Sequence, residues 1–506
     1  MKLADLLKGV EVTELKAPPE LEIADVCYDS RRAAADTLFV AVRGFESDGH
    51  RYIYAAAAKG AVCAVCEEPP ECDIPYVIVP DSRLALALIS VNYFRSPASE
   101  MVMMGVTGTN GKTTTCRMLE QMARDAGRDC FANRSGSNLE RGIAADFAAN
   151  ASLFGKPRRR FAVIECDEAA FRRVCGEVKP AVAVVTNIFR DQLDRYGEVT
   201  HTLAGIREGL ARSPETRVCL NADCSLTSSL APDAPDRVRF FGMDAALGEA
   251  AAVSDAPRCI FCGAEYEYDY HTFAHLGGFR CPQCGYSRAE PDVAIVEVDA
   301  LEPDSSLAQL RVDGEFLPAA VSLPAAYNLY NAAAAVAAAT ALGVDAKSAV
   351  RSLAHIESGF GRMERFELGE ARVTMVLVKN PAGCDRAIDY LASRPDGVTA
   401  VFCLNDEIAD GTDVSWIWDA AFERLFEPER KPMDIIVSGI RAEDMRLRLK
   451  YAGADEESIR LIHGATELID LIAGCKGDVC ILPTYTAMLP LRAELASRCG
   501  RKEFWK

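Results

Sequence analysis

The sequence lacks any apolar run long enough to cross a membrane. A spanning helix needs about 20 consecutive apolar residues, and the most apolar stretch, residues 332–342, is short and rich in alanine. It predicts a buried helix instead. The opening segment, MKLADLLKGVEVTELK, also lacks the apolar core of a signal peptide. We therefore expect a cytoplasmic protein without a transmembrane segment.

Positive charge is scarce. The 506 residues include 56 Lys and Arg against 74 Asp and Glu, which gives a formal net charge of -18. This balance argues against nucleic acid or an anionic membrane surface as a main partner, because both would repel an acidic protein. Backbone N–H groups can still bind phosphate locally.

Cysteine, in contrast, is plentiful. There are nineteen cysteines but only six histidines and three tryptophans. Thiols of a long cytoplasmic chain stay reduced, which argues against a disulfide scaffold. Neither a G-x-C-x-G nucleophile elbow nor a recognisable glutaminase context for any histidine is present.

The chain length predicts about three domains of roughly 150 residues each. In residues 1–99, short apolar runs alternate with an Ala-rich helical segment, which indicates a small α/β domain. Residues 100–357 predict a parallel α/β domain, interrupted at residues 256–290. Residues 358–506 predict a Rossmann-like domain with the strands VTMVLVKN, VTAVFCLND, MDIIVSG and DVCILPT.

A phosphate-binding loop is predicted between the strand MVMMGV and a helix over residues 112–126. Its sequence, at residues 105–115, is GVTGTNGKTTT. Glycines let successive N–H groups point at phosphate oxygens, Lys112 can reach the terminal phosphates, and the Thr113 hydroxyl can join a Mg²⁺ shell. Val106 stands where the usual motif has glycine, so the loop is a variant. The alternative is a turn that binds nothing. The candidate nucleotide-binding residues are Gly108, Thr109, Asn110, Gly111, Lys112, Thr113 and Thr114.

Two later strands end in polar residues. The segment FAVIECDE places Glu165 and Asp167 after an apolar strand, and TNIFRDQLDRYG places Asn187, Asp191 and Asp194 after the next. In a parallel sheet these ends open at the edge that carries the phosphate loop. Glu165 is a candidate Mg²⁺ ligand, and the alternative is a solvated strand end.

Four cysteines have the spacing of a zinc ribbon. Cys259, Cys262, Cys281 and Cys284 form two C-x-x-C pairs, each followed by glycine. Tight turns of this kind deliver two thiolates each to a tetrahedral zinc, and four protein ligands make the site structural. The alternative is unliganded or redox cysteines. We expect His271 and His275, between the pairs, to lie on the ribbon's hairpin rather than bind metal.

Residues 404–423, LNDEIADGTDVSWIWDAAFE, combine tryptophans with carboxylates. They contain Trp416 and Trp418 together with the acids Asp406, Glu407, Asp410, Asp413 and Asp419. Tryptophan is enriched at the hot spots of protein interfaces. We therefore expect an exposed loop that contacts another protein. The alternative is that the tryptophans pack locally and the acids are merely solvated.

Five motifs, in their order along the chain, resemble those of the Mur ligase superfamily: GTNGKTTT, ECDEA, TNIFRDQLDRYG, YNLYNAAAA and GRMERF. That family has three domains and joins an ATP-activated carboxylate to an amine in cell-wall precursor synthesis. The resemblance implies that Lys112 and Thr113 contact the nucleotide and Mg²⁺, and that Glu165 binds Mg²⁺. It also implies that Asn328 and Asn331 lie near the nucleotide and that Arg362 lies at a domain junction. Many members have histidine where Gln192 stands here, which puts their metal arrangement in doubt.

Four features resemble the MurT-type subunit of lipid II isoglutaminyl synthases. They are the cysteine ribbon and the segments VKNPAGCDRAID, LNDEIADGTDVSWIWD and ILPTYTAMLPLR. This resemblance implies a ligase that uses ATP, Mg²⁺ and a structural Zn²⁺. It would convert the α-carboxylate of D-glutamate in a peptidoglycan precursor, lipid II or a UDP-MurNAc-peptide, to D-isoglutamine through an acyl phosphate. Ammonia would come from a GatD-type class I glutamine amidotransferase subunit. An aspartate of the tryptophan segment would complete that partner's Cys–His pair. Asp413 and Asp410 both qualify, and we prefer Asp413.

The N-terminal stretch YDSRRAAADTLFVAVRGFESDGHRYIYAAAAKGA resembles the first domain of MurE-type ligases. Ser30, Arg31 and the DGH at residues 48–50 match the part that holds the UDP-sugar. One rival function is therefore a MurE-type amino-acid ligase, although no DNPR-like motif is present in the third domain. Another is a non-catalytic, nucleotide-binding scaffold for a glutaminase, against which Lys112, Thr113 and Glu165 argue.

Overall fold

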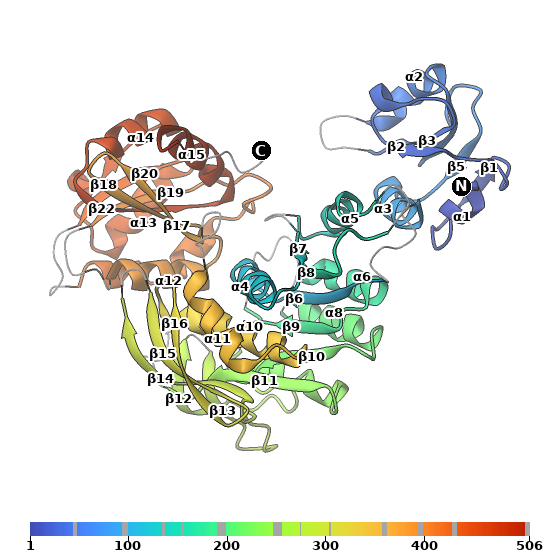
Figure 1. Ribbon diagram of the computed structural model, residues 1–506. Coiled ribbons are helices and arrows are strands. Elements are labelled where there is room, and N and C mark those ends of the chain that lie inside the picture. Colours follow the sequence, from blue (N-terminus) through green and yellow to red (C-terminus); the bar gives the residue numbers. More distant parts are fainter. Residues whose placement is uncertain are drawn as a thin grey trace. The chain divides into compact units, whose positions relative to one another are not determined.

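The computed structural model is built around three large β-sheets and one two-stranded hairpin (Figure 1). The residues that the structure describes are 1–43, 48–93, 100–133, 137–152, 156–189, 199–245, 256–273, 275–302, 305–356, 362–392, 394, 398–427 and 433–500. The chain divides into two compact units: one contains residues 1–105 and 128–180, and the other residues 106–127 and 181–506. The three sheets confirm the expected three-domain α/β architecture, whereas the domain boundaries stay predictions.

The first sheet belongs to the N-terminal domain. Its strand order is β1 (Glu14–Lys16), β5 (Tyr76–Ile78), β4 (Ala61–Cys66), β3 (Thr37–Val40) and β2 (Asp25–Cys27). Because side chains alternate along β4, Cys63 and Val65 face a core with α1 (Leu3–Leu6) and α3 (Ser82–Tyr93). Ala64 and Cys66 face a second core with α2 (Ile53–Ala58). The sheet is thus covered on both faces, as a small α/β domain requires.

The second sheet has nine strands. Their order is β16 (Glu315–Val321), β15 (Ser306–Val312), β14 (Val293–Leu301), β11 (Val238–Met243), β10 (Arg217–Asn221), β9 (Val182–Val185), β6 (Val102–Thr107), β8 (Phe161–Glu165) and β7 (Cys130–Ala132). The pairs β9–β10, β10–β11, β11–β14 and β7–β8 are parallel. The parallel pairs confirm the expected parallel-sheet domain, and β14, β15 and β16, which are antiparallel to one another, extend its sheet. Buried and exposed residues alternate along β15 and β16, as in a sheet covered on one face.

Helices of this region are α4 (Lys112–Asp125), α5 (Glu140–Ala149), α6 (Glu168–Val178), α8 (Val199–Ala211), α9 (Ser225–Ser228), α10 (Ala326–Ala341) and α11 (Ala346–Ser352). Helix α4 begins after Gly111 and ends before Gly127, both of which have positive φ. Helix α10 is buried from Asn328 to Ala339 and packs against α4 and β11. Its alanines allow this close approach, and this is the buried helix that the sequence predicted.

The cysteine ribbon contains the hairpin of β12 (Glu267–Phe273) and β13 (Leu276–Arg280). It lies in the chain between β11 and β14, at the place in the sequence where the interruption was predicted. Within the described part of the chain, every helix is too short or too polar to cross a bilayer.

The third sheet is a doubly wound α/β sheet. Its strand order is β17 (Arg362–Leu368), β18 (Ala371–Val376), β22 (Gly477–Pro483), β19 (Thr399–Cys403), β20 (Asp434–Ser438) and β21 (Arg460–Leu461). Along β19, Val401 and Cys403 face a core with α14 (Ala465–Ala473) and α15 (Tyr485–Arg498). Ala400 and Phe402 face a core with α12 (Pro381–Ala392) and α13 (Ala442–Ala452). The strands from β18 to β21 are parallel, which confirms the Rossmann-like prediction. The antiparallel β17 was missed.

Candidate active site, cysteine cluster and tryptophan segment

The phosphate loop depends on two glycines in left-handed backbone conformations. Gly108 has φ +116° and Gly111 has φ +85°. A Cβ atom on Gly108 would collide with Thr186 Oγ1, and one on Gly111 would collide with Asn331 Oδ1. The positive φ values disfavour any residue with a side chain, because L-residues rarely adopt the left-handed conformation. The collisions exclude a Cβ atom for lack of space. The loop can therefore close tightly only with glycine at these positions.

The segment that follows β9 braces the loop. Asn187 Oδ1 accepts a 3.0 Å hydrogen bond from the Asn110 N–H, and Asn187 Nδ2 donates to the Asn110 carbonyl at 3.1 Å. Thr186 Oγ1 donates to the same carbonyl at 2.7 Å. The Thr109 N–H donates to the Asn187 carbonyl at 2.9 Å. Asn187 therefore lies directly against the loop and fixes its backbone on both sides of Asn110.

The loop presents positive charge and backbone donors. Lys112 is buried, and its Nζ donates to the Gly108 carbonyl at 2.5 Å. The first turn of α4, with Thr113 and Thr114, leaves N–H groups without intrahelical acceptors and carries the positive end of the helix dipole. Asn110 Nδ2 is buried and has no hydrogen-bond partner among the described residues. A buried donor of this kind needs an acceptor, so the loop is suited to an anion such as phosphate.

Helix α10 brings two asparagines to the same site. Asn331 lies against Gly111, and its Nδ2 donates to Asn328 Oδ1 at 3.2 Å. Asn328 Nδ2 donates in turn to the Pro324 carbonyl at 2.6 Å. Ala325, which precedes the helix, has φ +76°, a conformation that costs energy in a non-glycine residue. Strained backbone therefore positions the buried asparagine pair beside the loop.

In the other unit, the backbone of Glu165 is held by an asparagine. Glu165 is buried at the end of β8; its N–H donates to Asn133 Oδ1 at 2.7 Å, and Asn133 Nδ2 donates to its carbonyl at 2.8 Å. Asn138 Nδ2 lies 3.5 Å from Glu165 Oε1. The neighbouring Asp167 caps α6 by accepting from the Ala169 N–H. Of the two strand-end acids, Glu165 is thus the one not used as a helix cap.

Several expected residues are not placed. Asp191, Gln192 and Asp194 lie outside the described residues. Arg362 begins β17, but its side chain lies outside the described part of the chain. Their predicted roles stay predictions.

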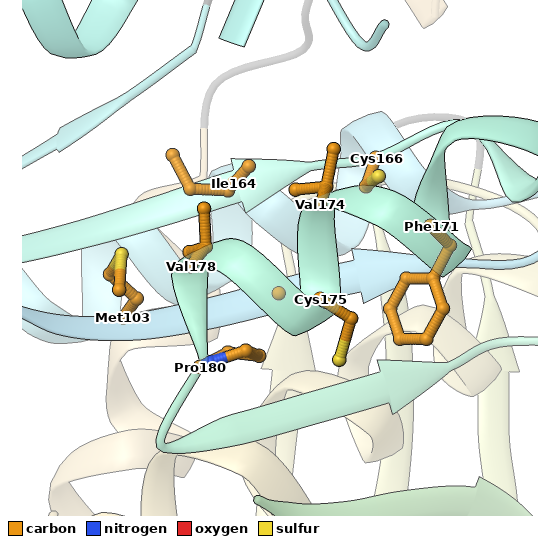
Figure 2. A pocket seen from close by; sticks show the side chains of 9 residues that line it. Met103, Ile164, Cys166, Phe171, Val174, Cys175, Val178 and Pro180 are labelled. Atoms are coloured by element: carbon orange, nitrogen blue, oxygen red, sulfur yellow. The ribbon is translucent and has the colours of Figure 1, made fainter. Parts of the chain in front are cut away.

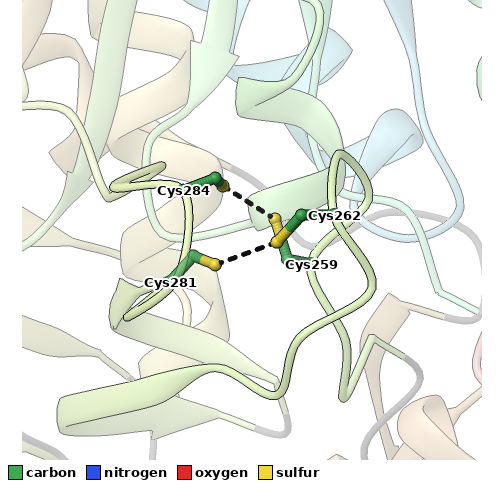
Figure 3. A group of neighbouring side chains, drawn as sticks. All are labelled: Cys259, Cys262, Cys281 and Cys284. Carbon is green, nitrogen blue, oxygen red and sulfur yellow. Dashed lines mark hydrogen bonds between the residues drawn. The ribbon is translucent and has the colours of Figure 1, made fainter.

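The four ribbon cysteines point toward one another from two turns (Figure 3). Their sulfur atoms all lie within 4.8 Å of one another, and the Cys259–Cys284 and Cys262–Cys281 sulfur distances are 3.6 and 3.4 Å. Zinc–sulfur bonds of about 2.3 Å in a tetrahedron place sulfurs about 3.8 Å apart. The cluster therefore fits a zinc ion, and His271 and His275 are not part of it.

The two cysteine turns share the same backbone hydrogen bond and a glycine in the left-handed conformation. The Gly263 N–H donates to the Cys259 carbonyl at 2.8 Å, and the Gly285 N–H donates to the Cys281 carbonyl at 3.1 Å. Gly263 and Gly285 have φ values of +76° and +78°. Backbone N–H groups, chiefly that of Cys284, lower the pKa of Cys281 to about 6. They favour the thiolate form that binds metal.

The tryptophan segment is only partly an exposed loop, which corrects the expectation. It contains the 3₁₀ helix η6 (Ser415–Trp418) and leads into η7 (Phe422–Leu425). Trp416 is half-buried and packs against the core of the third sheet, whereas 48% of Trp418 is exposed. One tryptophan thus anchors the segment and the other is available to solvent.

Arg448 of α13 holds this segment in place. It is buried, and its guanidinium donates to the carbonyls of Ile417 at 2.9 Å and Ala420 at 2.7 Å. It also pairs with Glu423 at 2.8 Å and lies 5.4 Å from the ring centre of Trp418. Since the planar guanidinium offers several donors at fixed angles, one side chain can fix several points of the segment.

The two candidate aspartates differ in environment. Asp410 is buried and accepts from the Thr486 N–H at 2.7 Å and from the Thr486 hydroxyl, at the start of α15. Asp413 is exposed, and its carboxylate accepts from the Ser415 N–H at 2.8 Å. Hydrogen bonds from Ser415 lower the pKa of Asp413. Asp413 is therefore an ionised carboxylate open to solvent, whereas Asp410 supports the fold.

Several apolar side chains are exposed on residues 404–418 and on or beside α13. Five of them form what we call the docking patch. Ile408 and Trp418 belong to residues 404–418, Ile440 precedes α13, and Leu447 and Tyr451 lie on α13. Trp418 contacts Tyr451, with ring centres 5.7 Å apart. Asn405 Oδ1 accepts from the Ile440 N–H, which joins the two segments. Exposed apolar patches of this kind mark protein contacts.

The N-terminal motif residues make local contacts. Asp48 accepts from the N–H of His50 and lies 2.6 Å from its Nδ1, while His50 Nε2 accepts from the Glu67 N–H at 2.8 Å. Arg31 pairs with Asp29 on the surface. Ser30 begins the 3₁₀ helix Ser30–Arg32. These contacts account for turn geometry, and binding of a UDP-sugar stays a prediction.

A small hollow in the first unit is entirely apolar (Figure 2). It is lined by β6, β8 and α6, among others by Met103, Ile164 and Val174. Burial raises the pKa of the lining thiol Cys166 far above its usual range, so the thiol stays protonated and inert. Without converging polar groups the hollow does not resemble a ligand site.

Family models match most of the chain. A model described as "Mur ligase family, catalytic domain" matches residues 22–107, "Mur ligase middle domain" matches 106–339, and "MurT ligase C-terminal" matches 377–488. The lipid II isoglutaminyl synthase subunit MurT of Streptococcus pneumoniae is 34% identical over 410 residues, covering 80% of this chain and 89% of the relative. The chain belongs to the MurT family of Mur ligases. This confirms the resemblance that the motifs indicated.

Other relatives agree with this assignment. The MurT subunit of Staphylococcus aureus is 32% identical over 77% of this chain and 86% of its own. A 2,6-diaminopimelate-adding ligase of Caldanaerobacter subterraneus is 27% identical over 79% of this chain and 73% of its own. Among solved structures, MurF of Acinetobacter baumannii superposes with a TM-score of 0.69 at 20% identity, covering 98% of both chains. MurF of Thermotoga maritima, solved with ADP, gives 0.66 at 18% identity, covering 95% of this chain and 98% of its own.

The contacts of several structurally important residues had no signal in the sequence. Thr186 and Phe189 belong to a recognised motif, but the bonds of Thr186 to Asn110 and of the Phe189 N–H to Thr109 were not foreseen. Arg448, and Asp223, which accepts from the Tyr330 hydroxyl, are revealed only by the structure, where both are buried. Composition and spacing cannot identify such residues, because their partners are distant in the chain.

We predict that Gly111→Ala weakens Mg–ADP binding at least about tenfold. The left-handed conformation alone costs an alanine roughly 1–2 kcal/mol, and the new Cβ meets Asn331 Oδ1. The matched control is Gly127→Ala. Gly127, just after α4, also has a left-handed conformation with φ +69°, but a Cβ atom there would meet no neighbouring atom. Calorimetric titration should show normal affinity for the control. Normal affinity for Gly111→Ala would show that the loop does not hold the nucleotide.

We also predict that the purified chain holds about one zinc per molecule. Cys281→Ser should remove the metal, because a hydroxyl does not replace a thiolate ligand of zinc. Cys219→Ser, a buried cysteine outside the cluster, should retain it. Elemental analysis measures both. Zinc-free wild-type protein prepared without chelators would contradict the zinc assignment.

Proposed function

We propose that this chain is the ATP-dependent ligase subunit of a lipid II isoglutaminyl synthase. It would amidate the α-carboxylate of D-glutamate in a peptidoglycan precursor and yield D-isoglutamine. The observation that carries the proposal is the combination, in one MurT-family chain, of a braced phosphate loop and an exposed aspartate on the segment that carries the exposed Trp418. The braced loop suits phosphoryl transfer, and the exposed aspartate suits contact with an ammonia-producing partner.

The proposed chemistry at the phosphate loop is activation of the carboxylate. Bound MgATP would supply a phosphoryl group, which turns the carboxylate oxygen into a good leaving group as an acyl phosphate. Lys112, now bonded to the Gly108 carbonyl, would turn to the phosphate oxygens and offset their charge. Thr113 and Glu165 are the proposed Mg²⁺ ligands, and Asn187, Asn328 and Asn331 hold the loop and its surroundings.

Ammonia would attack the acyl carbonyl and displace phosphate. Most ammonia is protonated at neutral pH, so enzymes of this type release it from glutamine with a cysteine and histidine. This sequence lacks a recognisable glutaminase elbow. We propose that a GatD-type glutamine amidotransferase supplies it and contacts the docking patch. Asp413, ionised and exposed, would orient that partner's histidine, which is the role of the third member of a catalytic triad.

A second candidate function is addition of an amino acid to a UDP-MurNAc-peptide. Two observations favour it: the N-terminal α/β domain and the similarity to a diaminopimelate-adding ligase. The third domain, however, lacks the DNPR-like motif of that reaction and matches the MurT model instead. Incubation with UDP-MurNAc-dipeptide, ATP and candidate amino acids separates the two functions. The precursor in the amidation reaction is lipid II or a soluble UDP-MurNAc-peptide.

We predict that Asp413→Asn abolishes glutamine-driven amidation by the two-protein complex but leaves ammonia-driven amidation intact. Asparagine keeps the shape but loses the charge that stabilises an imidazolium. Loss of the corresponding aspartate charge in a catalytic triad lowers kcat by about 10⁴-fold. Product formation with glutamine and with ammonium chloride, measured side by side, gives the two rates.

Three variants serve as comparisons. Asp419→Asn, at another exposed acid of the segment, should keep both activities, and Lys112→Ala should lose both. Asp410→Asn should lower the melting temperature, because it weakens a buried bond to Thr486. If Asp413→Asn used glutamine normally and Asp410→Asn did not, the triad role would belong to Asp410. Normal glutamine use by both would rule out this segment.

A further inference from the structure

The hairpin of the cysteine ribbon does not stand apart from the domain. His275, in the turn between β12 and β13, is fully buried, and its ring lies 4.6 Å from that of Phe189. Its Nε2 lies 3.6 Å from the buried Cys224 sulfur. Burial lowers the pKa of His275 to about 4. The residue is therefore a neutral ring that packs as an aromatic group and is not a member of the cysteine cluster.

Phe189 connects this ring to the phosphate loop. The Phe189 N–H donates to Thr109 Oγ1 at 3.0 Å, and Thr109 Oγ1 donates to the Phe189 carbonyl at 3.2 Å. The hydroxyl of a loop residue is thus held by both backbone groups of the residue that packs on His275. A shift of Phe189 must move Thr109, because these side chains and backbone groups are buried and close-packed.

A second connection leads from the ribbon to the asparagine helix. The hydroxyls of Thr272, on β12, and Tyr330, on α10, are 2.5 Å apart. Tyr330 also donates to Asp223 Oδ2 at 2.5 Å, and Asp223 Oδ1 accepts from Arg288 Nε at 2.5 Å. The Gly277 N–H of β13 donates to the Asp223 carbonyl at 3.1 Å. The ribbon hairpin therefore binds α10 through a buried polar network.

This network fixes the helix beside the nucleotide loop. Tyr330 is flanked on α10 by Asn328 and Asn331, and Asn331 contacts Gly111. Buried polar groups that are fully bonded hold one geometry, since any other arrangement leaves a donor or acceptor without a partner. Thr272 and Tyr330 thus connect the ribbon to the same loop that His275 reaches through Phe189.

We propose that the zinc ribbon positions the nucleotide site, through His275 and Phe189 to Thr109, and through Thr272 and Tyr330 to the helix of Asn328 and Asn331. This inference rests on the proposed nucleotide-binding function of the loop. Zinc would fold the ribbon, and the folded ribbon would hold the loop and helix in the arrangement that binds MgADP. His275 and Tyr330 are positioning residues, since neither belongs to the loop itself.

The test measures Mg–ADP affinity of the full-length chain by calorimetry, together with its zinc content. His275→Ala and Tyr330→Phe should each weaken Mg–ADP binding about tenfold, within the usual range of coupling between sites, while zinc content stays normal. His275→Phe should restore affinity, because a neutral ring can still pack on Phe189. The matched control is His271→Ala, a histidine of the same hairpin whose ring stacks within the ribbon on Tyr268, 4.2 Å away.

Zinc removal gives an independent measurement. Chain stripped with a chelator should bind Mg–ADP about tenfold more weakly, and readdition of zinc should restore the affinity. The inference is overturned if the stripped chain, His275→Ala and Tyr330→Phe all bind as the wild type does. A wild-type chain that failed to bind Mg–ADP at all would instead contradict the proposed function of the loop, so the two failures are distinguishable.

Discussion

The left-handed backbone at Gly108 and Gly111 is the constraint on which the rest of the site depends. Thr186, which follows β9, and Asn331 of α10 occupy the space that a Cβ atom at Gly108 and Gly111 would need. Asn187 and Thr186 then bind the backbone of Asn110 between the two glycines. The result is a braced loop at the start of α4, where the first N–H groups of the helix can bind an anion. These bonds brace the loop without any contribution from a ligand.

The ribbon hairpin is connected to that loop through Phe189 and Tyr330. We propose that a structural metal in the ribbon, far away in the sequence, contributes to the loop geometry by this route. In the Rossmann-like domain, Arg448 holds the segment that carries the exposed Asp413 and Trp418, through hydrogen bonds to its carbonyls and a contact with the Trp418 ring. Arg448, the half-buried Trp416 and the bond between Asp410 and Thr486 together hold this acidic segment on the domain.

Local patterns in the sequence predicted the parts of the fold that depend on neighbouring residues. The glycine spacing predicted the loop and the start of α4, and the two C-x-x-C pairs predicted the cysteine cluster. Pairings between distant segments were not predictable in this way: Asp223 with Tyr330, Arg448 with the 417–420 carbonyls, and Phe189 with His275. The antiparallel strands β14, β15 and β16 were not predicted, although buried and exposed residues alternate along β15 and β16. The burial of Asp410 and Trp416 was also beyond the sequence, which shows only that the segment is acidic and aromatic.

The central claim, that the braced loop activates a carboxylate by phosphorylation, has a direct isotopic test. A peptidoglycan precursor with oxygen-18 in the α-carboxylate of its D-glutamate would be amidated with ATP and ammonia, and the phosphate released would be examined by mass spectrometry. An acyl phosphate transfers a carboxylate oxygen to phosphate, so the account predicts a labelled oxygen in the inorganic phosphate for each amide formed. Amide formation with unlabelled phosphate, or with the label in AMP, would contradict the account.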